Sequence, residues 1–240
     1  MANPTAAMIV IGDEILSGRT RDANMYFLAQ ELTKLGIDLK EVRFVADDQP
    51  AIVATVREMS GKFGTVFTSG GIGPTHDDIT ADCVAEAFGR TIDVRDDARD
   101  LLVAHWERRG VEVNEARLRM ARIPAGATLI DNPVSIAPGF TVENVHVMAG
   151  VPNVFEAMVA SVLPTLVGGQ PLLSQTLRID RGEGEIAGPL SELAARYPEL
   201  SIGSYPFQQN GAYGANIVIR GTEAAMVDAA MTELAGLFPA

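Results

Sequence analysis

Short runs rich in Val and Ile alternate with segments of helical period throughout the first part of the chain, and this alternation limits the possible folds more than any other feature. Strands separated by helices are typical of parallel sheets, because each helix carries the chain back to the start of the next strand. We therefore predict an α/β fold, a mostly parallel sheet with helices on both faces. The strands are predicted at 6–12, 37–47 and 64–71, and the helices at 22–36, 50–61 and 78–89.

The helix at 22–36 illustrates the pattern. Its apolar residues form one stripe at spacings of three and four, Met25, Leu28, Leu32 and Leu35. Such spacing places them on one face of an α-helix. We expect Asp22 to cap the start of this helix and Gly36 to end it.

Later segments complete a first domain and begin a second. Residues 96–110 and 114–124 are predicted as helices, 124–151 as short strands with Pro- and Gly-rich turns, and 152–166 as a closing helix. We place one domain at 1–168, a linker at 167–171 and a small α+β domain at 172–240. Its strands are predicted at 172–180, 200–207 and 214–221, and its helices at 191–197 and 223–238.

Composition narrows the functional classes. The net charge of −12 disfavours a nucleic-acid partner, but backbone amides and a bound cation can hold a small phosphorylated molecule. Cys83 is the only cysteine, so it is expected to be a core thiol, and the three histidines show no metal-ligand spacing. The start lacks a basic segment and its apolar run is too short for a signal or membrane span, so we expect a cytoplasmic protein.

A glycine-rich loop, "TSGGIGPTHDDIT" at 68–80, follows the third predicted strand. In open parallel sheets, ligands bind beyond the carboxyl ends of the strands. Gly70, Gly71 and Gly73 permit unusual backbone angles and leave the main-chain amides accessible. With a helix from about Asp78, the loop offers backbone donors to an anion. The amides of 69–75 are our candidates for a phosphate site.

Carboxylates stand at three strand ends of the same predicted edge, in "GDE", "VADD" and "HDD". Two acids beside a phosphate repel it unless a cation lies between them, and carboxylate oxygens suit Mg²⁺. The alternatives are helix capping by Asp78 or Asp77 and solvated turns at Asp13 and Glu14. Asp48 is best explained as a helix cap before Pro50, which leaves Asp47 as the functional candidate of that pair.

These motifs resemble the molybdopterin-binding family, which includes MoaB, MogA and the N-terminal domain of CinA. The resemblance covers about 6–166 and rests on "GDEILSG" followed by Asn24, "VADD", "TSGGIGPTHDDIT", "NPVSIAPGF" and "AGVP". The "GPTHDDIT" segment and the following α+β domain are similar to CinA in particular. There is no room for the deamidase domain of long CinA chains, so a separate nicotinamide mononucleotide deamidase is a conceivable partner.

The resemblance implies a three-layer α/β/α domain, a homo-oligomer, and a phosphorylated heterocycle bound at the glycine loop. It implies metal-dependent hydrolysis of a nucleotide pyrophosphate such as ADP-ribose or FAD, with Mg²⁺, Mn²⁺ or Co²⁺. The alternative is non-catalytic binding of molybdopterin or a nucleotide, or a role in molybdenum-cofactor biosynthesis; a third is an interaction module. Asp47 and Asp78 match the family's functional aspartates, and Asp78, Asp47 and Asp13 are the expected metal ligands. The expected ligand-binding residues are Gly12, Asp13, Glu14, Asn24, Ser69, Gly70, Gly71, Gly73, Pro74, Thr75, Pro138 and Gly139.

The chain departs from the family pattern at two places. Ser135 and Ile136 stand where a Gly-Thr pair is common, and Val154 lies in "AGVPNV" where some relatives carry a nearby Glu. Side chains at 135 and 136 are expected to narrow the pocket. The second departure removes a carboxylate, so both bear on which substrate is bound and on catalysis.

Overall fold

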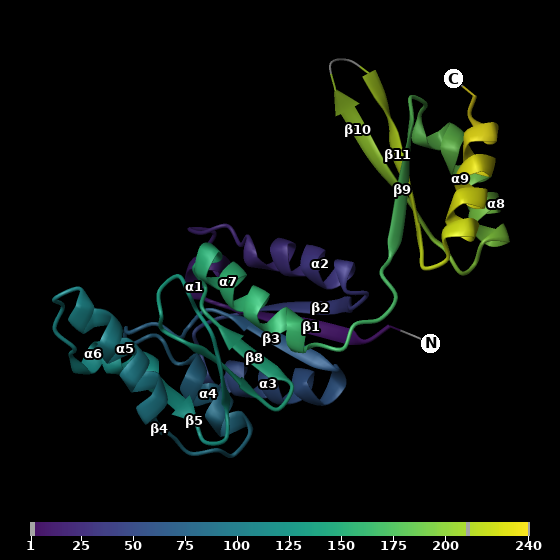
Figure 1. Ribbon diagram of the computed structural model, residues 1–240. Coiled ribbons are helices and arrows are strands. Elements are labelled where there is room, and N and C mark those ends of the chain that lie inside the picture. Colours follow the sequence, from purple (N-terminus) through teal and green to yellow (C-terminus); the bar gives the residue numbers. More distant parts are fainter. Residues whose placement is uncertain (1–2, 210–211, 240) are drawn as a thin grey trace. The chain divides into compact units, whose positions relative to one another are not determined.

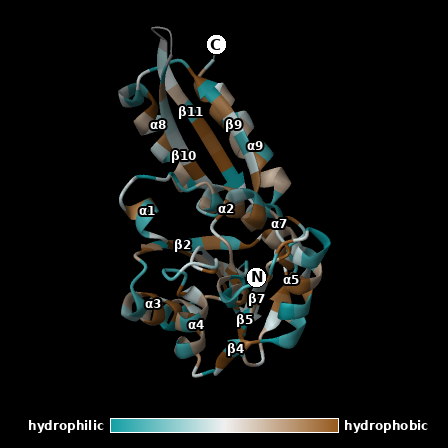
Figure 2. Cartoon of the chain, turned by 90° about the vertical axis from the view of Figure 1, so that its left-hand side faces the viewer, coloured by the Kyte–Doolittle hydropathy of each residue, from teal (hydrophilic) through white to brown (hydrophobic). Residues whose placement is uncertain are grey.

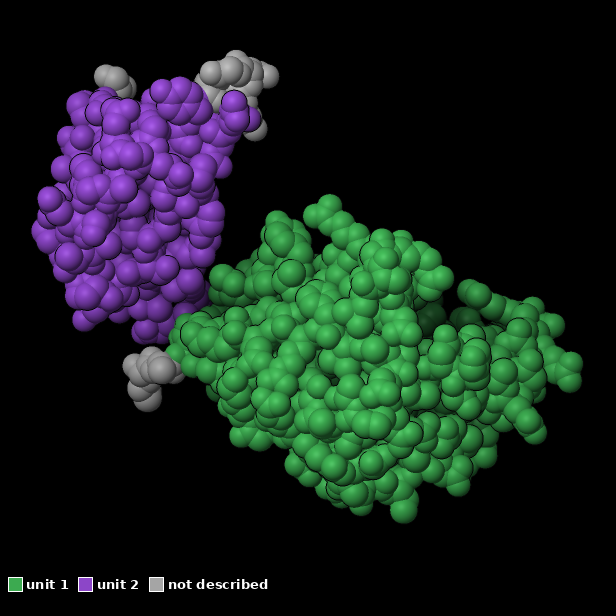
Figure 3. Space-filling model, turned by 180° about the vertical axis from the view of Figure 1, so that it is seen from behind, with its two compact units in different colours: residues 1–169 green, residues 170–240 purple. Residues whose placement is uncertain are grey.

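The computed structural model describes residues 3–209 and 212–239, and the chain divides into two compact units, 1–169 and 170–240 (Figures 1 and 3). The first unit is built on a six-stranded sheet in the order β2-β1-β3-β8-β7-β6. Strands β2, β1, β3 and β8 are parallel, whereas β7 and β6 are antiparallel to their neighbours. The prediction of a mostly parallel sheet is therefore confirmed. The strands are β1 Thr5–Ile11, β2 Asp38–Val45, β3 Thr65–Ser69, β6 Thr128–Ile130, β7 Gly139–Val142 and β8 Val145–Met148.

Helices cover both faces of this sheet, which gives the expected three layers (Figure 1). Along β1, Ala7, Ile9 and Ile11 pack into one core while Ala6, Met8 and Val10 pack into the other. A strand buried on both sides needs an unbroken apolar run instead of alternation. One face is covered by α2 Asn24–Lys34 and α7 Pro152–Val162, the other by α3 Gln49–Lys62, α4 Thr80–Ala87 and α5 Asp96–Arg108.

Helix ends follow the expected chemistry with small shifts. Asp48 caps α3 by accepting a hydrogen bond from the Ala51 N–H at 3.0 Å. The Asp22 carboxylate accepts from the Met25 N–H at 3.1 Å, although α2 begins two residues later than predicted. Gly36 follows α2 with a φ of 65°, which glycine adopts easily.

The predicted helix at 114–124 is wrong for most of its length. Only one turn forms, α6 Glu115–Leu118, and a short 3-10 turn then leads into β5 Arg122–Pro124. Strand β5 pairs antiparallel with β4 Ile92–Val94 in a separate two-stranded sheet. This pairing places Ile123 in the hydrophobic core, where it belongs to the same cluster as buried residues of the helices on one face of the sheet.

A two-residue turn joins β7 to β8. Glu143 has a φ of 53°, the left-handed conformation that such hairpin turns require. The Asn144 side chain donates to the carbonyl oxygens of Ser60 and Phe63, each at 2.9 Å, and so ties the hairpin to the end of α3.

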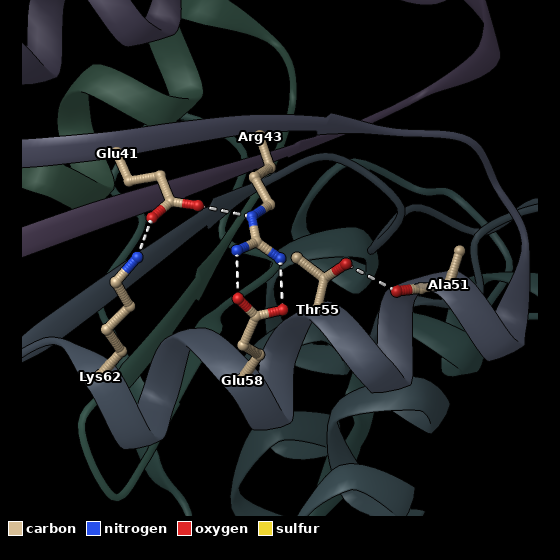
Figure 4. Close-up of polar contacts among 6 residues, drawn as sticks. All are labelled: Glu41, Arg43, Ala51, Thr55, Glu58 and Lys62. Carbon is tan, nitrogen blue, oxygen red and sulfur yellow. Dashed lines mark hydrogen bonds and ion pairs between the residues drawn. The ribbon is translucent and has the colours of Figure 1, made fainter.

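A surface ion-pair network links the edge strand β2 to α3 (Figure 4). Arg43 contacts Glu58 through both terminal nitrogens and Glu41 through Nε, while Lys62 binds Glu41 at 2.6 Å. These hydrogen bonds lower the pKa of both glutamates. The charged side chains along β2 also discourage pairing with another exposed strand.

The second unit has a three-stranded antiparallel sheet in the order β10-β11-β9, with its helices packed against the sheet. Its elements are β9 Leu173–Ile179, α8 Glu183–Arg196, β10 Ser201–Gln209, β11 Ala212–Gly221 and α9 Ala224–Leu237. Alternate residues of β11, Ala215, Ile217 and Ile219, are buried against the helices. Helix α8 begins eight residues before the predicted start at 191, because Gly184, Gly188 and Pro189 obscure its pattern.

Helices of both units are in mixed colours in Figure 2, as expected for helices that bury one side and expose the other. In the part of the chain that the structure describes, no helix is long and apolar enough to cross a bilayer.

Candidate functional site

A cavity of about 570 Å³ opens where the four parallel strands end. Segments that follow β1, β2, β3 and β8 supply most of its wall, as expected for an open parallel sheet. Its volume suits a ligand of drug or nucleotide size. The lining residues are Ile11, Gly12, Glu14, Thr20, Asp47, Gly70, Gly71, Ile72, Gly73, Pro74, Asp77, Asp78, Met120, Asn132, Ser135, Ala137, Ala149, Gly150, Val151, Pro152, Val154 and Met158.

The structure brings many of the predicted site residues together in this cavity and places others beside it. Those that line it are Gly12, Glu14, Asp47, Gly70, Gly71, Gly73, Pro74 and Asp78. Those outside the lining are Asp13, Asn24, Ser69, Thr75, Pro138 and Gly139. The assignment of this second group to ligand binding stays a prediction.

Asn24 has the clearest role among these residues. It is buried at the start of α2, and its Nδ2 donates to Ser69 Oγ at 2.7 Å and to the Gly150 carbonyl at 2.8 Å. The side chain thus joins the ends of β3 and β8. Pro138 lines a smaller pocket behind the glycine loop. Gly139 is buried where β7 begins.

The conformation and close packing of the loop require glycine at three positions, whether or not a ligand binds. Gly70 and Gly71 have φ angles of 109° and 70°, and a Cβ on either would collide with the Ile11 carbonyl or the Thr80 hydroxyl. A Cβ on Gly73 would lie 2.6 Å from Asp78 Oδ2. Bare backbone at these positions therefore lets the loop fold tightly onto β1 and α4. The Gly70 N–H donates to the Met148 carbonyl at 3.1 Å and the Thr75 N–H to Asp78, so two of the amides predicted to hold phosphate are already used within the protein.

Thr75 joins the two acids of the loop. Asp78 Oδ2 accepts the Thr75 N–H at 2.8 Å. The single hydrogen of the Thr75 hydroxyl is within reach of two acceptors, Asp78 Oδ2 at 2.6 Å and Asp77 Oδ1 at 2.5 Å. The contact with this hydroxyl lowers the pKa of Asp77. The alternative that Asp78 caps the next helix is wrong: α4 begins at Thr80, with Ile79 before it and no side-chain cap.

Asp47 enters the cavity from the end of β2, close to the first strand's loop. Its Oδ2 accepts the Asp13 N–H at 3.0 Å, and Asp13 Oδ1 accepts the Asp47 N–H at 3.4 Å. Burial raises the pKa of Asp47, and the negative charges of Asp13, Glu14 and Asp77 raise it further, against the lowering effect of the Asp13 amide. Asp47 is therefore more basic than an ordinary aspartate.

The charged side chains that line the cavity are all negative. Glu14, Asp47, Asp77 and Asp78 line it, whereas the lining contains no Lys, Arg or His. Across 3–209 and 212–239, no three His, Cys, Asp or Glu side chains are gathered closely enough to hold a metal by themselves. The donor set fits a hard cation that takes one or two carboxylates and completes its shell with ligand phosphates and water.

Two arginines near the glycine loop bind other groups of the protein. Arg119 Nη2 donates to the Asp78 carbonyl oxygen at 3.3 Å. Arg122 forms a two-pronged ion pair with Asp82 at 2.8 and 2.7 Å. Both line the small pocket behind the loop and neither lines the large cavity.

The sequence pointed to part of the far wall of the cavity: Ser135 and Val154, expected to bear on the pocket, line it, whereas Ile136 does not. Met120, Asn132 and Met158 were not predicted. The apolar surface of this wall includes Met120, Val154 and Met158, and its polar part consists of Asn132 and Ser135. The methionines look like ordinary core residues in their local patterns. The "NPVSIAPGF" motif pointed to Ser135, Ile136, Pro138 and Gly139, and it gave no signal for Asn132.

Comparisons with known proteins agree with this architecture. A family model described as "Probable molybdopterin binding domain" matches 7–168, and one described as "FAD synthase, middle domain" matches 171–240. A protein of Archaeoglobus fulgidus is 33% identical over 199 residues, which cover 83% of this chain and 84% of that protein. The crystal structure of CinA from Thermoplasma acidophilum, titled as a protein of unknown function, is 32% identical with a TM-score of 0.62, covering 67% of this chain and 98% of that one.

A probable FAD synthase of Caenorhabditis elegans is 32% identical over 255 residues, covering 96% of this chain. The chain spans about half the length of that relative, 49%. With a family model matched along most of the first unit and a similar CinA structure, the chain belongs to the CinA-like molybdopterin-binding family.

Proposed function

We propose that this chain binds a phosphorylated heterocycle in the large cavity and hydrolyses a nucleotide pyrophosphate, such as ADP-ribose or FAD, with the help of a divalent cation. The observation that carries the proposal is the lining of the cavity: four carboxylates without a basic side chain, next to a loop that contributes three glycines. A pyrophosphate ligand would be repelled by these acids unless a cation accompanied it.

The roles of the residues follow from their contacts. The amides of Gly71, Ile72 and Gly73, which lie between the two amides already used within the protein, hold one phosphate by its oxygens. Asp78 directs Oδ2 to Thr75, so Oδ1 is the oxygen that would hold a divalent cation. Mg²⁺, Mn²⁺ or Co²⁺ would neutralise phosphate charge and acidify a water molecule when bound. Asp47, whose pKa is raised, accepts the proton of the attacking water.

The apolar wall suits the ring of the ligand. Met120, Val154 and Met158 present flexible or branched apolar side chains to the cavity. The match of 171–240 to an FAD synthase middle domain favours a flavin nucleotide among the ligands. Addition of water across the P–O–P bridge of FAD would release AMP and FMN, and the same reaction on ADP-ribose would release AMP and ribose 5-phosphate.

The test is product analysis by anion-exchange chromatography. The purified chain is incubated with ADP-ribose or FAD, each with Mg²⁺, Mn²⁺ or Co²⁺ and with a chelator. AMP is expected with the wild type and metal, and not with Asp78→Asn. Glu107→Gln, an exposed change on α5, is the matched control and should retain activity. Full activity of Asp78→Asn would refute the role of Asp78.

Non-catalytic binding of molybdopterin or a nucleotide is the second candidate. It is favoured by the lack, within the described residues, of a ready-made three-ligand metal group. If no AMP forms under any condition, this function replaces the first. Calorimetric titration with AMP and FMN then shows whether nucleotides bind.

A further inference from the structure

The loop between β6 and β7 forms the polar part of the far wall, and one buried side chain organises it. Asn132, Ser135 and Ala137 line the cavity from this loop. Asn132 is 2% exposed, whereas Ser135 is exposed. A buried amide beneath an exposed hydroxyl is an arrangement in which the first can orient the second.

The orientation of the Asn132 amide is fixed by its neighbours. Its Oδ1 accepts the N–H groups of Val134 at 3.1 Å and Ser135 at 3.2 Å, which can only donate. Its Nδ2 donates to the Ala137 carbonyl at 2.8 Å, which can only accept. With both ends assigned, the fourth bond, 2.6 Å to Ser135 Oγ, must also be donated by Nδ2. All four hydrogen-bonding positions of the amide are used.

The Ser135 hydroxyl is therefore an acceptor toward Asn132. A hydroxyl has a single hydrogen, and that hydrogen is not used in this bond. Among the described residues, no side chain or carbonyl receives it. Ser135 thus offers an O–H donor to the cavity, with its oxygen held in place from behind.

Contacts within this loop hold one of its residues, Ile136, in a strained backbone conformation. Ile136 has a φ of 68°, a left-handed conformation that is costly for a β-branched residue. The Ile136 N–H donates to the Asn132 carbonyl at 2.9 Å, and the Asn132 side chain donates to the carbonyl of the next residue, Ala137. Asn132 therefore fixes the backbone on both sides of Ile136. Backbone strain of this kind persists where the surroundings over-determine it.

We propose that Ser135 is a specificity-determining residue that donates a hydrogen bond to an acceptor atom of the ligand, a phosphate or carbonyl oxygen, and that Asn132 is the positioning residue that directs this donor. The inference rests on the proposed use of the cavity for a phosphorylated heterocycle. It adds a contact from a loop that contributes no carboxylate to the lining of the cavity.

Binding tests the contact separately from hydrolysis. The probe is an ADP-ribose analogue whose bridging oxygen is replaced by methylene, titrated with Mg²⁺ in a calorimeter. Ser135→Ala should weaken its affinity by about tenfold, as expected for a lost hydrogen bond to a charged group. Ser135→Thr keeps the hydroxyl and should bind better than Ser135→Ala. Val134→Ala, an exposed change in the same loop, should bind as the wild type does.

The outcomes separate the two proposals. If the wild type binds the analogue and Ser135→Ala binds within twofold of it, the inference is overturned while pyrophosphate hydrolysis stands on the AMP assay. If no AMP forms from ADP-ribose but Ser135→Ala loses affinity, the inference stands and hydrolysis fails. If the wild type does not bind the analogue, the inference is overturned, and the AMP assay alone decides hydrolysis.

Asn132→Asp tests the positioning role. A carboxylate at this position accepts the Ser135 hydrogen and withdraws it from the cavity, so affinity should fall as far as in Ser135→Ala. Adding Ser135→Ala to Asn132→Asp should then cause no further loss, a coupling that a merely structural Asn132 would not show. Additive losses would contradict the role. Because a buried carboxylate can destabilise the fold, the thermal midpoint is measured for each variant, and the Ser135 series decides the proposal by itself if Asn132→Asp unfolds.

Discussion

Asp13 and Asp47 each accept a hydrogen bond from the other's backbone, at 3.0 Å to the Asp47 carboxylate and 3.4 Å to that of Asp13. The exchange fastens the loop after β1 to the loop after β2. Only Asp47 lines the cavity, while Asp13 is exposed outside it. The two acids were both expected as metal ligands, and the structure gives them unequal access to a ligand.

This inequality predicts different effects of matched substitutions. Asp47→Asn should reduce pyrophosphate hydrolysis by about a hundredfold or more, because an amide cannot accept the proton of the attacking water. Asp13→Asn keeps an oxygen acceptor for the Asp47 N–H, so turnover is expected to stay within about tenfold of wild type. The measurement is steady-state AMP release at saturating metal. Equal losses in the two variants would return Asp13 to the metal site.

The pH dependence of activity should report the charge around Asp47. Its carboxylate must be deprotonated to act as a base, so activity rises with pH as Asp47 loses its proton. Burial and neighbouring acids raise its pKa, so this rise lies above the range of a free aspartate. Glu14→Gln removes one of those negative charges and should move the acidic limb of the pH-rate profile to lower pH. The exposed variant Glu107→Gln should leave the limb in place, and a shift to higher pH in Glu14→Gln would contradict the assignment.

The requirement for glycine in the glycine loop can be tested by comparing substitutions of Gly73 and of a helix glycine, Gly61. A Cβ on Gly73 would lie 2.6 Å from Asp78 Oδ2, so Gly73→Ala must displace the carboxylate or the loop. A misplacement of about 1 Å in a catalytic group can cost about a hundredfold in rate, and a loss of that order is expected. Gly61→Ala, inside α3 with open space around it, should instead stabilise the fold by about 0.5–1 kcal/mol and leave activity unchanged. Rate and urea midpoint are measured for both; unchanged turnover in Gly73→Ala would argue against its fit with Asp78.

The parallel core and its carboxyl edge were predictable because their signals are local. The apolar run of β1, the Asp48 cap and Gly36 each follow from a few adjacent residues. The structure of the segment after Asn114 was not predictable from its own residues. Its local pattern is helical, but the pairing of β5 with β4 and the burial of Ile123 in the core outweigh that pattern. Local propensity yields to such long-range packing.

The remaining residues of the far wall, beyond Ser135 and Val154, could not be predicted for a similar reason. Met120, Asn132 and Met158 come from three separate segments and meet only in the folded unit. A carboxylate after a strand suggests a site by its chemistry, whereas a methionine suggests only core. Asn132 could be recognised as an organiser only from its four hydrogen bonds, which depend on the turn that follows it.

His146 predicts how the fold responds to acid. It is 8% exposed in β8, where its ring nitrogens lie 2.9 Å from Thr141 Oγ1 and 3.0 Å from Thr65 Oγ1. Burial lowers its pKa from 6.5 to about 4. The neutral ring is favoured in the folded state, so its contribution to stability is complete above pH 6.5 and is lost as the pH falls towards 4. The full loss corresponds to about 3 kcal/mol. Urea unfolding between pH 4 and 8 should show this slope in the wild type and in His105→Gln, and a flatter dependence in His146→Gln. Parallel curves for His146→Gln and the wild type would mean that other groups account for the acid sensitivity.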